Sequence, residues 1–433
     1  MVEELNNKQQ LFEFFEKNIR NKEIKNFEIP TILAKDIEDE EMVKNILNYC
    51  YEDIKNIIET YLDLEEKHYN LISLWIIGTY FHSKFNTYPY LYINAMKGSG
   101  KSRLLGLISE LSHEGSMQNS MTEAVLFRTN GTLCIDEFES VGKKGFENLR
   151  ELLNSAYKRG TLVKRMKKQK TFTGEEQVVE TFNVYRPIAM ANITGIENVT
   201  GDRCIKIIIE KSINEKKTKL IENYRNQEKI KVLKFTLTKL SSLECSLCSV
   251  VSPEHLSLLW NSFILEQPYT LTTLSSLPHK TTLTTLKILK ISFEKIKDSG
   301  INGRDLELSI PILVISLWIE GGLKEGFFDE TLNTLKFISD EKKEEEFVES
   351  YDISLIEFCS QQVEKEKEYF VSIKDLTKDF RSFLSVEDEW INERWLGRAL
   401  SRLKLTKQKK RFNWGICVIL DIKKAKEKIS IFK

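Results

Sequence analysis

The chain contains a short glycine-rich run that ends in a lysine and a hydroxyl residue, Ala95–Ser102 (AMKGSGKS). This run follows the apolar run Tyr90–Ile93 and precedes a segment, Leu104–Leu111, whose apolar residues recur at helical spacing. Glycines let backbone N–H groups turn inward around phosphates, and the amino end of a helix adds partial positive charge. A strand, a glycine loop ending in Gly-Lys-Ser and a helix form the context that a P-loop requires. We therefore expect a nucleotide's phosphates to be held here.

Each polar residue of this loop has an expected task. Lys101 is expected to reach the β- and γ-phosphates of ATP, and the Ser102 hydroxyl to ligate Mg²⁺. Ala95 stands where the usual first glycine would be. The alternative is a chance glycine turn, which the flanking strand and helix disfavour. The predicted nucleotide-binding residues of the loop are Gly98, Ser99, Gly100, Lys101 and Ser102.

A second apolar run, Thr132–Ile135, ends directly in Asp136 and Glu137. In a parallel sheet this strand end and the P-loop open at the same carboxyl edge, where ligands bind. Asp136 is then expected to hold Mg²⁺, and Glu137 to orient and deprotonate the attacking water. Alone, an Asp-Glu pair after an apolar run is usually only a strand end. Together with the P-loop it predicts a site that hydrolyses ATP.

Short apolar runs alternate with amphipathic helices through the middle of the chain. The spacing predicts an α/β fold with an open, mostly parallel sheet whose two faces are covered by helices. The four predicted strands are 90–93, 132–135, 187–191 and 206–209. The predicted domains are a helical N-terminal region (1–86), the α/β core (87–211), a helical lid or linker (212–350) and a small basic module (351–433).

Composition limits the kinds of protein that this chain can be. Its 433 residues include 64 Lys plus Arg and 64 Asp plus Glu, so attraction to a polyanion must come from local clusters. The apolar runs Leu71–Phe81 and Ile310–Ile319 fall short of the ~20 residues that a membrane span needs. Seven cysteines, and a start without the apolar core of a signal peptide, predict a reducing, cytoplasmic location. Cys245 and Cys248 lack the second pair that a structural zinc site would need.

One cluster of basic residues lies between the acidic strand end and the strand at 187–191. Seven basic residues fall between Lys158 and Lys170, and the β-prone flanks 161–163 and 178–184 predict a long hairpin with a basic tip. Lys167, Lys168 and Lys170 are the candidates for contact with nucleic acid. The alternative is a solvated basic loop.

A second basic cluster lies at the end of the chain. Ser372–Asp375 predicts the start of one helix, and a second helix over 392–403 carries arginines at i, i+4 and i+8. A basic turn and the strand Ile416–Ile422 are expected to follow, which is the layout of a winged helix-turn-helix. Residues 392–433 hold thirteen basic and three acidic residues, a charge that predicts a DNA partner. A winged-helix module that binds protein is the alternative. The candidate DNA contacts are Arg394, Arg398, Arg402, Lys409, Lys410 and Arg411.

These motifs together resemble those of AAA+ ATPases. The similarity is to superfamily-3 and MCM-like replicative helicases, and more closely to the ATPase and winged-helix part of mobile-element primase–helicases. The resemblance implies a hexameric ring that uses ATP and Mg²⁺, with single-stranded DNA in its channel and duplex at the winged helix. The N-terminal helices are expected to be too short for a primase, so any priming activity would come from a separate primase or polymerase. The segments that carry it are 61–105, 133–139, 152–165, 185–209 and the basic C-terminus.

The same resemblance implies roles for single residues. Asn192 would be the sensor-1 residue that touches the γ-phosphate or the attacking water, although an Asn that starts a turn is also common. Arg203 resembles an arginine finger that acts on a neighbouring subunit; an ion pair with Asp202 is the alternative, and Arg159 and Arg165 are rival fingers. Arg304 would be the sensor-2 residue of the lid. The hairpin would grip DNA in the channel.

The sequence leaves three functional classes open. The first is a ring-forming DNA helicase or replication initiator of a plasmid, phage or integrated mobile element. The second is a DNA-bound ATPase switch, such as a loader, regulator or defence ATPase, that does not unwind DNA. The third is a binding protein with a purely structural nucleotide site, which the set Lys101, Asp136 and Glu137 argues against.

Overall fold

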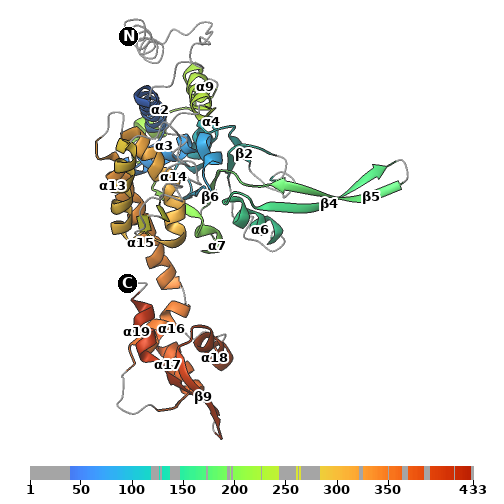
Figure 1. Cartoon of the computed structure of the whole chain (residues 1–433), viewed down its shortest axis with the longest axis vertical. Coiled ribbons are helices and arrows are strands. Elements are labelled where there is room, and N and C mark those ends of the chain that lie inside the picture. Colours follow the sequence, from blue (N-terminus) through green and yellow to red (C-terminus); the bar gives the residue numbers. More distant parts are fainter. Residues whose placement is uncertain are drawn as a thin grey trace. The chain divides into compact units, whose positions relative to one another are not determined.

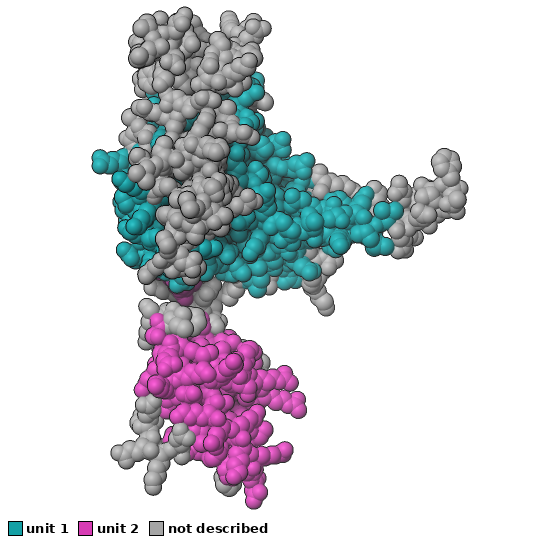
Figure 2. All heavy atoms as spheres, viewed as in Figure 1, with its two compact units in different colours: residues 1–336 teal, residues 337–433 magenta. Residues whose placement is uncertain are grey.

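The computed structural model of the chain divides into two compact units, residues 1–336 and residues 337–433 (Figure 2). Both units contain helices and strands (Figure 1). The residues that the structure describes are 40–118, 126, 129–136, 147–171, 174–192, 196, 198–225, 227–242, 260–261, 263–264, 283–320, 325–349, 351–362, 369–384, 391–413 and 415–430.

Unit 1 is built on a five-stranded sheet of order β2-β3-β6-β1-β7, in which all paired strands run parallel. The register places Leu91 of β1 opposite Ala189 of β6 and Ile205 of β7. The predicted α/β fold with a parallel sheet is therefore confirmed. Edge strand β2 was not predicted, because its sequence Ser-Met-Gln is too short to form an apolar run. The strands are β1 (Tyr90–Ala95), β2 (Ser116–Gln118), β3 (Leu133–Ile135), β6 (Ile188–Asn192) and β7 (Cys204–Ile209).

Helices pack on the sheet and around it. Alternate strand residues such as Tyr90 and Tyr92 join leucines of α6 in one core, and α4 packs against β1, β3 and β6. Helix α3 is buried from His68 to Phe81, which explains its almost wholly apolar sequence. No helix within the described ranges is long and apolar enough to cross a membrane. These helices are α2 (Glu40–Tyr61), α3 (Glu66–Phe81), α4 (Lys101–Leu111), α6 (Glu147–Ala156), α7 (Asn198–Gly201), α8 (Glu215–Thr218) and α9 (Glu228–Ser242).

Three further helices, α13, α14 and α15, lie in the region expected to be helical. Helix α14 packs against α2 and α3, where Phe81 and Trp318 meet edge to face with ring centroids 5.2 Å apart. The charged run 340–346 belongs to helix α15. The helices are α13 (Leu283–Ser299), α14 (Gly303–Glu320) and α15 (Phe327–Glu349), the last of which continues past the boundary between the units.

A long two-stranded hairpin interrupts the α/β core between α6 and β6. Its strands β4 (Leu162–Thr171) and β5 (Gly174–Asn183) have ten residues each and pair antiparallel along their whole length. The hairpin extends away from the sheet as an arm (Figure 1). The predicted hairpin is confirmed, and both of its strands are longer than their β-prone flanks indicated.

Unit 2 combines helices with a three-stranded antiparallel sheet of order β8-β10-β9. Its core includes Phe380, Leu396 and Leu400, and Phe380 stacks on the half-buried Trp395 at an interplanar angle of 8°. The side chain of Asn392 caps α18 by accepting from two backbone N–H groups. The elements are α16 (Tyr351–Ser360), β8 (Val371–Ser372), α17 (Ile373–Leu384), α18 (Glu393–Arg402), β9 (Thr406–Phe412), β10 (Gly415–Leu420) and α19 (Ile422–Ile429).

Two sequence predictions for this unit are wrong in detail. The residues expected to form a basic turn after α18, including Lys409 and Arg411, lie in strand β9. The strand expected to reach Ile422 ends at Leu420, because Asp421 caps a further helix through its side chain. Lysines are poor strand formers in isolation, but β9 is an edge strand where solvent-exposed charges are tolerated.

Candidate functional site

The glycine loop joins β1 to α4 with two residues in the left-handed region of backbone space. Gly98 has φ 82° and Gly100 has φ 95°, conformations that cost little only for glycine. At Gly100 an added Cβ would also lie 3.0 Å from the Leu62 side chain. The Ser99 hydroxyl donates to the Met96 carbonyl at 2.8 Å and so closes the loop on itself. These conformations explain the glycine spacing of the motif.

Helix α4 begins at Lys101, directly after the loop. The Leu104 N–H donates to the Gly100 carbonyl at 2.9 Å. The N–H groups of residues 101–103, in the first turn, therefore have no carbonyl partner within the helix. Such a turn carries partial positive charge and suits an anion. The loop and Lys101 thus have the geometry of an anion site.

Three strand ends meet beside this loop at the carboxyl edge of the sheet. Strand β6, which ends at Asn192, lies between β1 and β3, so Asn192 stands between the glycine loop and Asp136. Asn192 is 4% exposed and pairs in register with Asn94 of β1. Burial raises the pKa of the neighbouring Cys134 thiol far above its ordinary value, so Cys134 packs as an uncharged core residue. Glu137 lies outside the described residues.

A single cavity of about 660 Å³ contains the loop and the acidic strand end. Both proposed magnesium ligands, Ser102 and Asp136, line it. A hydroxyl and a carboxylate are hard oxygen donors of the kind that Mg²⁺ prefers, so the residues present fit this ion. Among the residues the structure describes, no group of three or more His, Cys, Asp or Glu could hold a metal by themselves. Cys245, Cys248 and His255 lie outside that set.

Another wall of the cavity comes from residues to which the sequence analysis assigned no role. Tyr61, Leu62 and Asp63 from the α2–α3 connection line the cavity together with Ser212, Lys217, Thr218 and Glu222. These residues form no motif that points to a ligand, and they are about 40 and 115 positions away from the loop. Only the fold brings them to this cavity.

Arg103 ties this wall to the P-loop helix. Its guanidinium donates to the carbonyls of Lys217 at 3.1 Å, Leu220 at 3.0 Å and Tyr61 at 3.3 Å. It also lies 3.4 Å from a carboxylate oxygen of Glu222. One side chain in the first turn of α4 therefore holds both segments of the wall.

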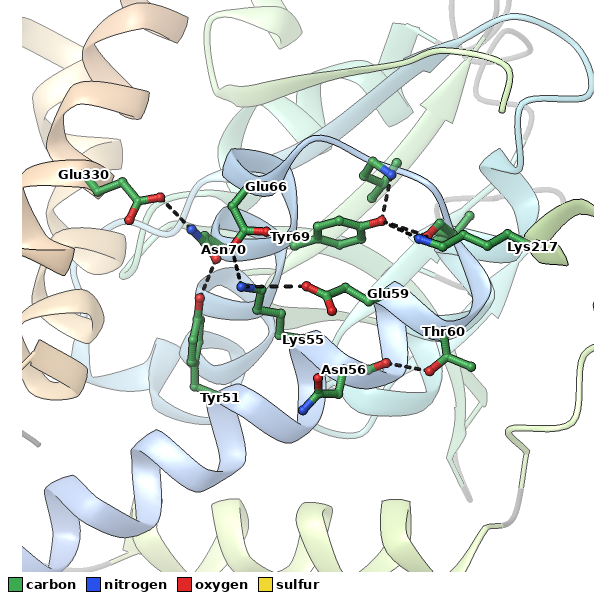
Figure 3. A network of polar contacts seen from close by, with 12 residues as sticks. Tyr51, Lys55, Asn56, Glu59, Thr60, Glu66, Tyr69, Asn70, Lys217 and Glu330 are labelled. Carbon is green, nitrogen blue, oxygen red and sulfur yellow. Dashed lines mark hydrogen bonds and ion pairs between the residues drawn. The ribbon is translucent and has the colours of Figure 1, made fainter. Parts of the chain in front are cut away.

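Lys217 fixes the wall from the other side. Its ammonium group donates to the Leu62 carbonyl at 2.7 Å and to the Tyr69 hydroxyl at 3.2 Å (Figure 3). The Tyr69 hydroxyl in turn donates to the same Leu62 carbonyl at 2.8 Å and accepts from the Leu64 N–H at 2.8 Å. The α2–α3 connection is thus held against the segment after β7 by hydrogen bonds rather than by apolar packing alone.

Two arginines assigned to the nucleotide lie at the other edge of the sheet. Arg203 directly precedes β7 and Arg304 opens α14; Arg304 pairs with Asp202. Because β7 runs parallel to β1, this amino edge is one strand length, about 20 Å, from the loop of the same chain. Arg304 is not among the residues that line the cavity, so the structure does not bring it to the loop of the same chain. Asp202, the alternative ion-pair partner of Arg203, pairs with Arg304.

Arg203 makes several contacts within its own chain. Its Nε donates to the Asn154 carbonyl at 2.8 Å, its Nη1 donates to the Val199 carbonyl, and its guanidinium lies over the Tyr157 ring at 5.2 Å. The other two candidates for an arginine finger lie elsewhere. Arg159 is exposed just before β4, and Arg165 is opposite Glu180 in the register of the hairpin.

The candidate DNA residues of the hairpin lie in the outer half of β4. The hairpin holds five basic and three acidic residues, and two of the acids, Glu175 and Glu176, stand on the outer part of β5. The tip therefore mixes both signs of charge and is less basic than the run 158–170 indicated. In the backbone register, Lys167 is opposite Val178, Lys168 is opposite Gln177 and Lys170 is opposite Glu175.

In unit 2 the three predicted DNA-contacting arginines of α18 differ in whether they have an ion-pair partner in the same unit. Arg394 and Arg398 are exposed on α18. Arg402 is exposed too, but its Nη2 contacts both carboxylate oxygens of Asp352 at 2.6 and 2.7 Å. Lys409, Lys410 and Arg411 are exposed along β9.

The parallel sheet, its flanking helices and the glycine loop after β1 make unit 1 an α/β domain consistent with a P-loop NTPase-like core. No protein-family model matches the chain, and no curated protein matches it. It is similar to a solved structure described as "SCCmec type IV Cch - active helicase", with 11% identity and a TM-score of 0.34 over 84% of this chain and 68% of that one. It is also similar to the NrS-1 C-terminal region, with 13% identity and a TM-score of 0.28 over 85% of this chain and 74% of that one. At TM-scores this low, neither likeness assigns a function.

Proposed function

We propose that this protein is an ATP-hydrolysing, ring-forming DNA helicase or replication initiator of a mobile genetic element. The observation that carries the proposal is the position of the hairpin in the chain. It lies between β3, which ends at Asp136, and β6, which ends at Asn192. A change at the γ-phosphate, between these strand ends, can therefore move the arm on which Lys167, Lys168 and Lys170 lie.

In this proposal each residue at the carboxyl edge has a task. The loop N–H groups and Lys101 bind the phosphates, Asn192 positions the attacking water, and Glu137 takes its proton. Mg²⁺ held by Ser102 and Asp136 would neutralise charge on the phosphates. Asn192 is assigned this task because β6, which it ends, lies between the strand before the loop and the strand that ends at Asp136; its side chain is not among those that line the cavity.

Exposed apolar residues beside the nucleotide cavity support assembly of several copies. Met96, Ile213 and Ile221 are 75%, 96% and 84% exposed, and they adjoin residues that line the cavity. Val199, beside Arg203 at the opposite edge, is 50% exposed. Contact between unlike edges of successive subunits is heterologous, and such contacts close into rings when the rotation allows it. A hexamer is the ring that the resemblance implies, and an arginine entering the neighbour's site would complete catalysis.

Unit 2 supplies the duplex contact in this proposal. A helix, a second helix and the β9–β10 hairpin follow one another as in a winged helix. Exposed Arg394 and Arg398 on the second helix and the lysines of β9 form a basic surface in a chain of zero net charge. Priming would come from a separate primase or polymerase.

The second candidate is a DNA-bound ATPase switch without unwinding activity, such as a loader, regulator or defence ATPase. The mixed charge of the hairpin tip, where Glu175 stands opposite Lys170, favours it. Strand displacement on forked DNA, compared with ATP turnover, separates the two. ATP-dependent displacement that a Lys101→Ala variant lacks supports the helicase. DNA-stimulated ATP turnover without displacement on any fork supports the switch.

A further inference from the structure

The cavity at the glycine loop is lined by more than groups that suit phosphate. The glycine loop and the first turn of α4 suit the phosphates. The α2–α3 connection and the segment after β7 line the same cavity, and the Leu62 side chain lies close to Gly100. Because the phosphates would be held at the loop, these two segments, which form one wall of the cavity, are the ones available to the nucleoside.

Asp63 stands in that wall as a hydrogen-bond acceptor in a fixed position. Its Oδ2 accepts from the Ser212 hydroxyl at 2.7 Å, and its Oδ1 lies 3.7 Å from the Lys217 ammonium. Lys217 is itself anchored on the Leu62 carbonyl and the Tyr69 hydroxyl (Figure 3). A carboxylate has about four lone-pair sites, so these two partners leave capacity for a ligand.

The ligand chemistry that this acceptor fits is a vicinal diol. A nucleoside offers donors at its ribose 2′ and 3′ hydroxyls, and two neighbouring carboxylate oxygens can accept from both. Acidic side chains in other nucleotide-binding folds read ribose hydroxyls in this way. The adjoining Tyr61 and Leu62 give the same wall an apolar part that suits the base.

We propose that Asp63 binds the ribose hydroxyls of the nucleotide, held in place by Ser212 and Lys217, and so favours nucleotides that carry both hydroxyls. This proposal rests on the proposed nucleotide site. Asp63 is a specificity residue here, whereas Ser212 and Lys217 are positioning residues.

The test is equilibrium binding of ADP and 2′,3′-dideoxy-ADP, both with Mg²⁺, to the full chain by titration calorimetry. The wild type is expected to bind ADP about 10-fold more tightly than the dideoxy compound, the effect of a hydrogen bond to a charged group. Asp63→Ala is expected to weaken ADP binding about 10-fold and dideoxy-ADP binding less than 2-fold. Ser212→Ala is also expected to weaken ADP binding more than dideoxy-ADP binding, but by a smaller factor than Asp63→Ala.

Matched variants separate this proposal from the nucleotide site itself. Glu215→Gln removes a carboxylate of the same segment that pairs with Lys219 and does not line the cavity, and it is expected to change neither affinity. The ribose assignment would be overturned if Asp63→Ala lowered the affinities for ADP and dideoxy-ADP equally, or if the wild type bound both with equal affinity. Either outcome would leave the nucleotide site intact. If the wild type binds neither ligand, or if Lys101→Ala binds ADP as the wild type does, the nucleotide site fails and the ribose assignment fails with it.

Discussion

The Arg304 guanidinium of α14 pairs with the Asp202 carboxylate, which lies 102 positions earlier in the chain, just before β7. Arg304 and Arg203 also share one aromatic partner, since their guanidinium carbons lie 5.7 and 5.2 Å from the centroid of the Tyr157 ring. Two cations thus stand together at the amino edge of the sheet. Because Asp202 pairs with Arg304, Arg203 is the better of these two for the proposed contact with a neighbouring copy of the chain.

We expect Arg203→Ala to lower ATP turnover roughly 1,000-fold, the lower end of the effect of an arginine finger. Arg304→Ala should lower ATP turnover less, because it removes the ion-pair partner of Asp202 rather than the proposed arginine finger. If Arg203 acts in trans, mixing Arg203→Ala with Lys101→Ala chains restores turnover, since mixed assemblies contain some complete interfaces. Steady-state phosphate release measures both effects. A mixture no more active than its two components would contradict action in trans.

The triple change Lys167/Lys168/Lys170→Ala should abolish strand displacement while leaving DNA-independent ATP turnover within about 2-fold, because the hairpin lies outside the nucleotide cavity. For binding of single-stranded DNA, the slope of log affinity against log salt should fall in magnitude by about 2, as three lost phosphate contacts imply. Glu175→Gln with Glu176→Gln is the matched control on the facing strand, and it should not weaken DNA binding. Displacement that survives the triple change would remove the hairpin's role.

We expect the three arginines of α18 to have two different functions, DNA binding and stabilisation of unit 2. Arg394→Ala with Arg398→Ala should weaken duplex binding without changing the melting temperature, because both side chains are exposed. Arg402→Ala breaks the pair with Asp352 and should lower the stability of unit 2, by up to about 1 kcal/mol for a pair this exposed. Fluorescence anisotropy with labelled duplex and thermal melting measure the two effects. Equal losses of DNA affinity for all three arginines would contradict the division.

A partly buried polar chain joins three helices of unit 1 (Figure 3). The hydroxyl of Tyr51, a fully buried residue, donates to Asn70 Oδ1 at 2.5 Å, and Asn70 Nδ2 donates to Glu330 at 2.8 Å. Tyr51→Phe should therefore cost about 1–3 kcal/mol of unfolding free energy, because it leaves a buried acceptor without its donor. Glu59→Gln, which disturbs a partly exposed ion pair with Lys55 on the same helix, should cost less than about 1 kcal/mol. Denaturant unfolding compares them, and similar losses would speak against the buried chain.

Much of the local structure could be predicted because its signals are short-range. The glycine pattern of the loop follows from the positive φ angles of Gly98 and Gly100. The buried strands and the hairpin follow from apolar and β-prone runs, and the Asn392 and Ser372 caps from side chains that bond nearby N–H groups. The turn predicted at 407–411 is wrong because the edge position of β9, a tertiary feature, outweighs the composition of those residues.

By itself, the sequence determined that a glycine loop with the P-loop pattern, an acidic strand end and two basic segments belong to one chain, since each is encoded in neighbouring residues. The tertiary structure decided which of them meet. Insertion of β6 between β1 and β3 brings Asn192 between the loop and Asp136, and the same fold adds Asp63 and Lys217 to the cavity wall. It also sets Arg304 beside Asp202 at the far edge. Parallel strands joined by long crossovers place distant residues side by side, and spacing along the chain carries no record of that proximity.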